Sequence, residues 1–488
     1  MFLGLDIGTT GIKGLVVDDN GKLMKSYNYP LEMQVPKPGW AEQHPDTWYE
    51  GVMSILGKCS KEYTIQGIGF SGQMHSLVLL DEKDRVLRDA ILWCDQRTTA
   101  QCRYATEQLN GEREVIDLIS NPILEGFTLG KLLWVRENEP DLYRRIAKIM
   151  LPKDYICYKL TGSFGIDFSD ASGTAFFDVV SGQWSDPILD RLDINRATLP
   201  PVYQSNETRG TLKKEIADKL GWPETAVVSG GADNAVAAYG IGIKDTGDTM
   251  VSIGTSGTVF TVTDSQEPDY EGKLHLFRHV TEGRKYYMGV MLSAAHSLNW
   301  MMKQLRMEND FSEIENQLKA VSPGAGGLLF LPYLNGERTP HRDPNARGVL
   351  FGLSSKTTRA EIIRAVIEGV TFGLRDSFEL IREKTGVKAI RVVGGGAKNR
   401  EWCRILANNL KSSILIPEVD EGGAYGAAML AAKGTGLKEE ALDNWVKIKE
   451  SIEPDTSQYG IYDSLYNEFQ GLYRDLRERF SSVHNLFE

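Results

Sequence analysis

The sequence predicts an α/β protein with two domains of similar design that face each other across a cleft. Three observations predict this fold class. A Gly/Thr-rich turn joins two strands near the N-terminus, in Leu5-Asp6-Ile7-Gly8-Thr9-Thr10-Gly11. The pattern returns in Val251-Ser252-Ile253-Gly254-Thr255-Ser256-Gly257, where Gly254 follows Gly8 by 246 residues in a chain of 488. Strands and helices alternate after both copies, which favours two α/β units.

The first half of the chain is expected to open as a meander. Strands are predicted over Phe2–Ile7, Gly11–Val17 and Lys22–Tyr29, with an Asn20-Gly21 turn before the third. A helix over Asp46–Cys59 follows, and then strands Ile65–Phe70, Leu77–Asp81 and Ala90–Trp93. Helices dominate to about Leu160, and the strand Ala226–Val228 comes near the end of this half.

The second half is expected to repeat this plan. Strands Met250–Ile253 and Thr258–Thr263 form its hairpin, and a helix is predicted over Arg359–Lys384, started by a Thr358/Glu361 capping box and ended by Gly386. A strand over Ala389–Val393 and a helix over Glu401–Leu410 follow. The aromatic stripe from Tyr462 to Phe480 predicts a last helix that packs on the body, or otherwise an oligomer contact.

Composition and charge exclude several classes of function. The net charge of −11 provides no basic excess for binding nucleic acid or an anionic membrane. No apolar run approaches the roughly 18 residues of a membrane span. The N-terminus enters a strand at once, which predicts no signal peptide. The five scattered cysteines and the absence of a CxxC pair indicate a reduced, cytoplasmic protein.

The two Gly/Thr turns are candidate phosphate-binding loops. Such a turn directs successive backbone N–H groups and hydroxyls into one concavity, which suits phosphate oxygens. Only the first copy carries a carboxylate, Asp6, where the second has Ser252, as expected if a magnesium ion binds beside the first turn. The alternative interpretation is a pair of ordinary glycine-rich β-turns.

Two familiar nucleotide motifs do not apply. Gly67-Ile68-Gly69-Phe70-Ser71-Gly72 formally fits the dinucleotide pattern, but its glycines lie inside a predicted strand and another strand follows. No GxxxxGK[ST] sequence is present. The protein is therefore predicted to be neither a Rossmann dinucleotide-binding protein nor a Walker-type NTPase.

Asp233 is the candidate general base. It follows the strand Ala226–Val228 and the Gly230-Gly231 turn, where a helix would begin. We expect it to remain ionised at the helix N-terminus and to accept a proton from a substrate hydroxyl. The alternative is a simple N-cap, the common role of aspartate at such a position.

Polar clusters after other strands are candidate ligand contacts. Gln73-Met74-His75 and Trp93-Cys94-Asp95-Gln96-Arg97 combine hydrogen-bonding groups with an apolar indole face, as sugar recognition requires. A solvated or internally satisfied histidine is the alternative. Gly394-Gly395-Gly396-Ala397 would allow a flat ring to approach the backbone, unless it is only a tight strand-to-helix connection.

Together these residues resemble the FGGY carbohydrate kinases, within the larger group of actin- and hexokinase-like ATPases, over nearly the whole chain. Gly126 to Asn138 is similar to the first family signature, and Gly348 to Leu353 with Glu361 to Glu368 is similar to the second. Ser71 to His75 is similar to the substrate loop of the xylulokinases within the family. Cys94 departs from the Trp-Asn-Asp form that some of them have.

The resemblance implies two actin/hexokinase-like (ribonuclease H-like) domains with a cleft between them. The expected boundaries are 1–244 for the sugar-binding domain with the catalytic base, 245–440 for the nucleotide-binding domain and 441–488 for a helical segment packed on the body. The implied ligands are a ketose, ATP and Mg²⁺, and the resemblance suggests a homodimer. The implied sugar contacts are Gln73, Met74, His75, Trp93, Asp95, Asp233 and Asn234.

The other implied roles concern the nucleotide and the metal. Asp233 is the implied base, and Asp6 and Asp233 are the implied metal ligands. Nucleotide contacts are implied for Gly8, Thr9, Thr10, Lys13, Gly254, Thr255, Gly395, Gly396 and Asn399. D-xylulose is the expected substrate, and D-ribulose, L-xylulose or a related polyol stays an alternative. A non-kinase actin-like ATPase and a catalytically silent sugar sensor also stay open, although the sensor would be expected to lose Asp6 or Asp233.

Overall fold

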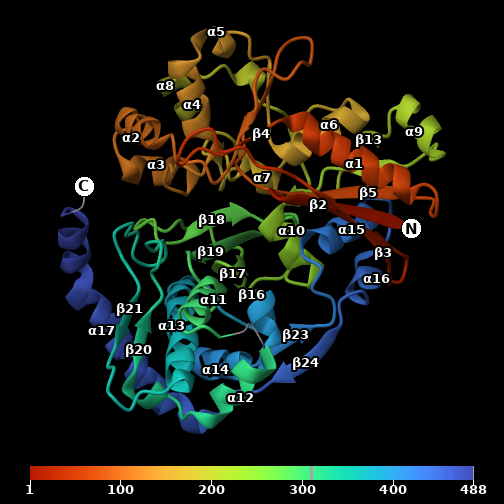
Figure 1. Ribbon diagram of the computed structural model, residues 1–488. Coiled ribbons are helices and arrows are strands. Elements are labelled where there is room, and N and C mark those ends of the chain that lie inside the picture. Colours follow the sequence, from red (N-terminus) through yellow and green to blue (C-terminus); the bar gives the residue numbers. More distant parts are fainter. Residues whose placement is uncertain (308–310, 487–488) are drawn as a thin grey trace.

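The protein consists of two α/β halves, placed one above the other in the computed structural model (Figure 1), which describes residues 1–307 and 311–486. Each half is built on one mixed sheet. The strands of the first sheet are β1 (Phe2–Ile7), β2 (Gly11–Val17), β3 (Leu23–Pro30), β5 (Gly67–Gly72), β13 (Thr208–Thr211), β14 (Ala226–Val228) and β15 (Gly231–Ala232). Those of the second are β16 (Thr249–Ile253), β17 (Gly257–Thr263), β18 (His275–Arg278), β19 (Lys285–Met291), β22 (Ile390–Val393), β23 (Ile414–Pro417) and β24 (Ile448–Ile452).

The two sheets repeat one topology. The first has the order β3-β2-β1-β5-β14-β13, and the second has β19-β17-β16-β22-β23-β24 with β18 added beside β19. Corresponding pairs have the same direction: β1 and β16 are antiparallel to the hairpin strands that follow them and parallel to β5 and β22. The predicted repeat of the two halves is therefore confirmed.

Helices cover both sheets. Those before residue 241 are α1 (Pro45–Cys59), α2 (Thr99–Gln108), α3 (Glu112–Ile119), α4 (Thr128–Asn138), α5 (Pro140–Tyr143), α6 (Pro152–Thr161), α7 (Phe168–Ala171), α8 (Asp186–Arg191), α9 (Lys214–Leu220) and α10 (Asp233–Gly240). Those after it are α11 (Ala295–Gln304), α12 (Phe311–Ala320), α13 (Arg359–Lys384), α14 (Arg400–Leu410), α15 (Gly423–Gly434), α16 (Glu439–Asp443) and α17 (Tyr459–His484). None of the helices in the described ranges is both long and apolar enough to cross a bilayer.

Short strands and 3₁₀ turns complete the chain. The two-stranded pairs are β4 (Glu42–Gln43) with β7 (Ala90–Ile91), β6 (Val78–Leu80) with β8 (Lys148–Met150), β9 (Ile166–Asp167) with β12 (Val202–Tyr203), β10 (Phe177–Asp178) with β11 (Gln183–Trp184), and β20 (Leu329–Leu331) with β21 (Val349–Phe351). The 3₁₀ turns are η1 (Arg196–Thr198), η2 (Ala325–Gly327), η3 (Gly395–Lys398) and η4 (Thr456–Gln458).

Helix α13 shows which local signals hold and which do not. Its predicted capping box is confirmed, because Thr358 Oγ1 accepts from Glu361 N at 3.3 Å and Glu361 Oε2 accepts from Thr358 N at 2.7 Å. The predicted Gly386 cap is wrong. Thr385 is the C-cap, in extended conformation at φ −151° and ψ 150°, so the chain leaves the helix without a left-handed residue.

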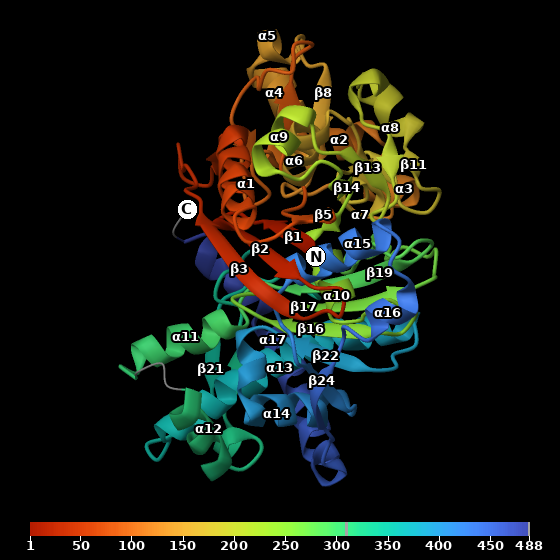
Figure 2. The ribbon, with the colours of Figure 1, turned by 90° about the vertical axis from the view of Figure 1, so that its right-hand side faces the viewer.

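Helix α15 joins the two halves, because it packs on the first sheet although it comes late in the sequence. In Figure 2, α10 and α15 lie between the two sheets. Strand glycines allow this approach: a Cβ at Gly4 would lie 1.8 Å from Ala424 O, and one at Gly69 would lie 2.1 Å from Ala427 O. The glycines of the rejected dinucleotide pattern therefore serve packing between backbones.

We expect Gly69→Ala to destabilise the protein by about 1–3 kcal/mol or more, the usual cost of overpacking a core. The new Cβ would meet the backbone of α15, which has no flexible side chain to move aside. Gly57→Ala is the matched control, because its Cβ meets nothing within 4 Å inside α1 and should stabilise that helix slightly. Equal unfolding free energies of the two variants in urea would contradict the close α15 contact.

The C-terminal helix α17 packs along the second half. Tyr462, Tyr466, Phe469 and Tyr473 form its buried face, and Tyr466 Oη donates to Asp376 Oδ1 of α13 at 2.7 Å. Strand β24 precedes it and pairs with β23, so the segment after residue 440 contributes a strand to the second sheet as well as helices.

Candidate active site

The two predicted phosphate turns lie at the ends of equivalent hairpins. Gly8 N donates to Gly11 O at 3.0 Å in the first turn, and Gly254 N donates to Ser256 O at 3.0 Å in the second. Within the described ranges, the N–H groups of Thr9, Thr10, Thr255 and Ser256 have no acceptor from the protein itself. Both turns therefore present free backbone donors, as an anion-binding concavity requires.

Asp6 lies at the end of β1, beside the first turn. Its Oδ1 accepts from Ser71 Oγ at 2.8 Å, which fixes the carboxylate against β5. Burial raises the pKa of Asp6, and the Ser71 bond and the Lys13 charge only partly offset that effect. A cation bound near Asp6 would lower this pKa and favour the charged carboxylate.

Asp233 is the first residue of α10, and Ala232 precedes it as the N-cap. Burial, with a further contribution from the Asp6 charge, raises the pKa of Asp233 to about 7. Burial therefore opposes the expected ionisation of Asp233, because desolvation outweighs the effect of the helix terminus. A carboxyl with a pKa near the working pH is well matched to general-base catalysis.

We expect the kcat/KM for the sugar to fall as the pH drops through about 7. A raised pKa means that below about pH 7 the protonated form of Asp233 prevails, and this form cannot accept the hydroxyl proton. The measurement is kcat/KM at saturating MgATP across about pH 6 to 8. A flat profile over that range would contradict the role of Asp233.

The predicted sugar loop contacts the first phosphate turn directly. Gln73 is buried, and its Oε1 accepts from Ser76 Oγ at 3.0 Å and from Thr9 Oγ1 at 3.5 Å. Trp93 is 47% exposed, and its Nε1 donates to Thr9 Oγ1 at 3.0 Å. The indole face is thus held at the cleft next to the turn, where the C–H surface of a sugar could pack on it.

His75 is held in one tautomer. Its Nδ1 lies 2.6 Å from Gly173 O, and because a carbonyl only accepts, Nδ1 must carry the proton. Burial lowers the pKa of His75 to about 3, so the ring is neutral at physiological pH. Nε2 is therefore an acceptor for a ligand hydroxyl. Met74 beside it is buried in a hydrophobic cluster to which both halves contribute.

Other predicted sugar and phosphate contacts have partners within the protein. Asp95 is completely buried; its carboxylate binds Arg97 and accepts from Ala41 N at 2.6 Å, so here it supports the loop that carries Trp93. Asn234 Nδ2 donates to Asp233 Oδ1 at 3.1 Å. Lys13 forms an ion pair with Glu421, which comes from the loop before α15.

The predicted adenosine-binding turn packs on the second phosphate turn. Gly394 has a φ of +90°, and a Cβ there would lie 2.8 Å from Ile253 O; a Cβ at Gly396 would lie 2.4 Å from Ile253 Cγ2. Gly395 begins η3. Asn399 is the N-cap of α14, where its Oδ1 accepts from Trp402 N at 3.0 Å and its buried Nδ2 has no partner. Asn399 therefore serves here as a helix cap, with its side chain buried rather than open to an adenine ring.

A cavity of about 240 Å³ lies between the two halves, beside Asp233 and the Gly394 turn. It is lined by Asp233, Asn234, Ala237, Ile241, Met250, Ser252, Val393, Gly394, Asp420, Gly422 and Gly423. No group of three or more His, Cys, Asp or Glu side chains in the described ranges could hold a metal by itself. Two buried carboxyls with raised pKa values, Asp6 and Asp233, fit Mg²⁺, which binds one or two protein carboxylates together with substrate phosphates.

We expect Asp6→Ala to raise the Mg²⁺ concentration for half-maximal turnover by roughly tenfold or more, since even loss of an outer-shell partner costs 10–100-fold in metal affinity. The KM for the sugar should change little, because Asp6 lies beside the phosphate turn. Mg²⁺-dependent ATP binding, measured by calorimetry, should weaken in parallel. Ser71→Ala, which removes only the hydrogen bond to Asp6 and keeps the charge, should have a smaller effect than Asp6→Ala. An unchanged magnesium titration would contradict the assignment.

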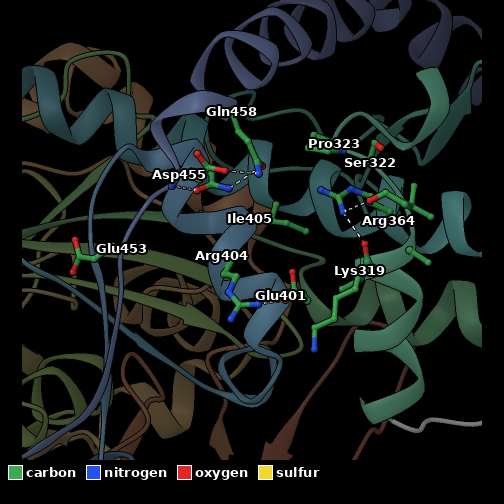
Figure 3. Close-up of a pocket in the computed structure, with 14 residues that line it drawn as sticks. Lys319, Ser322, Pro323, Arg364, Glu401, Arg404, Ile405, Glu453, Asp455 and Gln458 are labelled. Atoms are coloured by element: carbon green, nitrogen blue, oxygen red, sulfur yellow. Dashed lines mark hydrogen bonds and ion pairs between the residues drawn. The ribbon is translucent and has the colours of Figure 1, made fainter.

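A larger pocket, of about 390 Å³, lies between α12, α13, α14 and η4 (Figure 3). Its charged groups are already paired. Arg364 binds Glu368 at 2.8 Å and donates to Leu318 O and Val321 O, and Asp455 accepts from Ser457 and Gln458. These satisfied groups do not point to a reaction, so the site between the two halves is the candidate active site.

Sequence reasoning missed several residues that complete the site. Gly173 orients His75, Asp420 Oδ2 accepts from Gly394 N at 2.9 Å, and Glu421 holds Lys13. All three act through contacts between distant parts of the chain. The run Asp167-Phe-Ser-Asp-Ala-Ser-Gly-Thr174, with its many small polar residues, is the one local signal that could have drawn attention to Gly173.

Two repeated α/β domains, with a Gly/Thr turn at the hairpin of each and a buried carboxyl at the cavity between them, are the arrangement expected of an ATP-dependent phosphotransferase. Residues 1–240 match the model of the N-terminal domain of the FGGY family of carbohydrate kinases, and residues 249–435 match that of its C-terminal domain. The chain therefore belongs to the FGGY family of carbohydrate kinases. It is an ATP-dependent carbohydrate kinase, and such kinases use Mg²⁺ with ATP.

Relatives agree with this family over the full length. The xylulose kinase of Lactococcus lactis subsp. lactis is 40% identical over 488 residues, covering 98% of this chain and 97% of the relative. The crystal structure of a xyloylose kinase from Brucella ovis has a TM-score of 0.91 at 33% identity, covering 98% and 99%. That of a gluconate kinase from Lactobacillus acidophilus has a TM-score of 0.93 at 26% identity, covering 99% of both chains.

Proposed function

We propose that this kinase phosphorylates D-xylulose at O5, with ATP as the phosphoryl donor and Asp233 as the general base. The observation that supports the mechanism most is the buried Asp233, whose pKa burial and the Asp6 charge raise to about 7. The xylulose kinase relatives and the neutral His75 acceptor support the choice of sugar.

The protein's own groups supply positioning and proton transfer. The free amides of the two turns would bind the phosphates, and Asp233 would take the proton of the attacking hydroxyl as the phosphoryl group is transferred. Bound Mg²⁺, held by Asp6 and Asp233, would neutralise phosphate charge. His75 Nε2 would accept from a ketose hydroxyl, and Trp93 would cover the C–H face of the sugar.

Location and assembly belong to the same proposal. The five cysteines are free and four of them are buried, which is consistent with a reducing cytoplasm. The homodimer suggested by the family resemblance stays part of the proposal, and light scattering of the purified protein would test it.

The test is sugar-dependent ADP release with D-xylulose, D-ribulose, L-xylulose, gluconate and no sugar. We expect D-xylulose to have the highest kcat/KM, by about tenfold or more over the other sugars. A preference for gluconate or D-ribulose would overturn the substrate and leave the kinase intact. ADP release that no sugar stimulates would instead favour the actin-like ATPase alternative.

A further inference from the structure

The segment from Asp167 to Thr174, which contains α7, holds both the base and the sugar loop. Ser169 Oγ accepts from Ala232 N at 2.9 Å, and Ala232 directly precedes Asp233. Four residues further on, Gly173 O accepts from His75 Nδ1 at 2.6 Å. One short element thus fixes two groups that come from positions about 160 residues apart in the sequence.

The carboxylate of Asp167 determines the orientation of the Ser169 hydroxyl. Its hydroxyl donates to Asp167 Oδ2, which also accepts from Ser169 N and from Ser205 Oγ, both at 2.8 Å. A hydroxyl has only one proton, so with that proton on Asp167 its lone pairs face Ala232 N. Gly231 allows the approach, because a Cβ there would lie 2.8 Å from Ser169 Oγ.

A buried lysine compensates the charge of Asp167. Lys153 Nζ lies 2.9 Å from Asp167 Oδ1, 2.6 Å from Asp154 Oδ1 and 3.1 Å from Asp170 Oδ2, and all four side chains have no solvent exposure. Desolvation makes such a cluster a poor source of stability compared with apolar packing. The cluster instead holds the Ser169 hydroxyl in one orientation, beside the backbone amide of Ala232, the residue before Asp233.

We propose that Ser169, oriented by Asp167 and Lys153, is a positioning residue for Asp233. It fixes the amide of Ala232 and thereby aims the Asp233 carboxylate at the sugar hydroxyl. The inference rests on the proposed role of Asp233 as the general base, and it adds a residue that touches neither sugar nor nucleotide.

Ser169→Ala and Ser205→Ala form a matched pair for the test. Both serines are buried, and each variant removes one hydroxyl from the same oxygen of Asp167. Only Ser169 contacts Ala232 N through its side chain; the Ser205 contact with this turn, to Gly230 N, uses its carbonyl and survives the substitution. Both variants should therefore be destabilised, because each removes a hydrogen bond to Asp167. Only Ser169→Ala should also disturb the position of the Asp233 carboxylate, because only Ser169 accepts from Ala232 N through its side chain.

We expect Ser169→Ala to lower kcat about tenfold or more, with the KM values for ATP and D-xylulose within about twofold, as for loss of an interaction made only in the transition state. Ser205→Ala should keep kcat within about twofold despite a similar loss of thermal stability. Ser169→Cys keeps the shape of the side chain and supplies only a weak acceptor, so it should show the same pattern if the alanine variant does not fold. Equal kcat losses at Ser169 and Ser205 would overturn the proposal.

The Asp233→Asn background separates positioning from a general structural effect. If Ser169 acts only through the base, Ser169→Ala should slow Asp233→Asn by less than about twofold, because effects of residues that act as a unit are not additive. A full further tenfold loss would overturn the positioning role. An Asp233→Asn single variant with nearly normal kcat would instead refute the proposed base, which distinguishes the two failures.

Discussion

Asp233→Asn is expected to lower kcat by about 100-fold or more, the usual scale for loss of a general base. The amide cannot accept the hydroxyl proton, yet its oxygen can still accept from Asn234 N, which lies 2.7 Å from Asp233 Oδ1. The amide oxygen can also remain an oxygen ligand for Mg²⁺, so the fold and ATP binding should be nearly unchanged. Steady-state kinetics, thermal unfolding and ATP calorimetry on the same preparation test these three expectations.

Asp420→Asn is the matched control for that variant. Asp420 lines the same cavity, and its side chain accepts from Gly394 N, a bond that asparagine can keep. We expect a loss in kcat of less than about fivefold, since Asp420 is not placed to take the proton. Similar losses in both variants would mean that any charge change in the cavity slows turnover, and Asp233 would not be the specific base.

His75→Ala is expected to raise the KM for D-xylulose roughly tenfold or more while the KM for ATP changes little. A site that hydrogen-bonds a sugar hydroxyl through a buried acceptor loses about 1–3 kcal/mol when that partner is removed. Discrimination between D-xylulose and D-ribulose should erode as well. The measurement is kcat/KM for both sugars in both proteins.

A second variant distinguishes the effect of losing the imidazole ring from the effect of backbone strain at position 75. His75 has a φ of +70°, which alanine disfavours and asparagine tolerates. His75→Asn should therefore keep the loop conformation and still lose the Nε2 acceptor, so it should reproduce the rise in KM. A normal KM in His75→Asn would assign the alanine effect to backbone strain and remove His75 from the sugar site.

The strands and long helices could be predicted because their signals are local. The apolar segments on either side of the two Gly/Thr turns placed β1, β2, β16 and β17, and the Thr358/Glu361 pair placed the start of α13. The same local reasoning failed at Gly386, because the conformation of the helix end depends on Thr385, which leaves α13 extended.

The candidate site was only partly predictable, because its electrostatics and supports are long-range. Sequence places Asp233 at a helix start, but burial in the assembled cleft and the Asp6 charge raise its pKa. The pairing of Lys13 with Glu421 joins residues 408 positions apart. Likewise, the packing of α15 on β1 and β5 explains the strand glycines only once both halves are folded.

The most direct test of phosphoryl transfer to a ketose in this cleft is phosphorus–proton NMR of the reaction product from D-xylulose and MgATP. We predict one equivalent of ADP for each sugar phosphate, with the phosphorus nucleus coupled to the protons on C5. ADP accompanied only by inorganic phosphate, or phosphorus coupled to the protons on C1, would contradict the account.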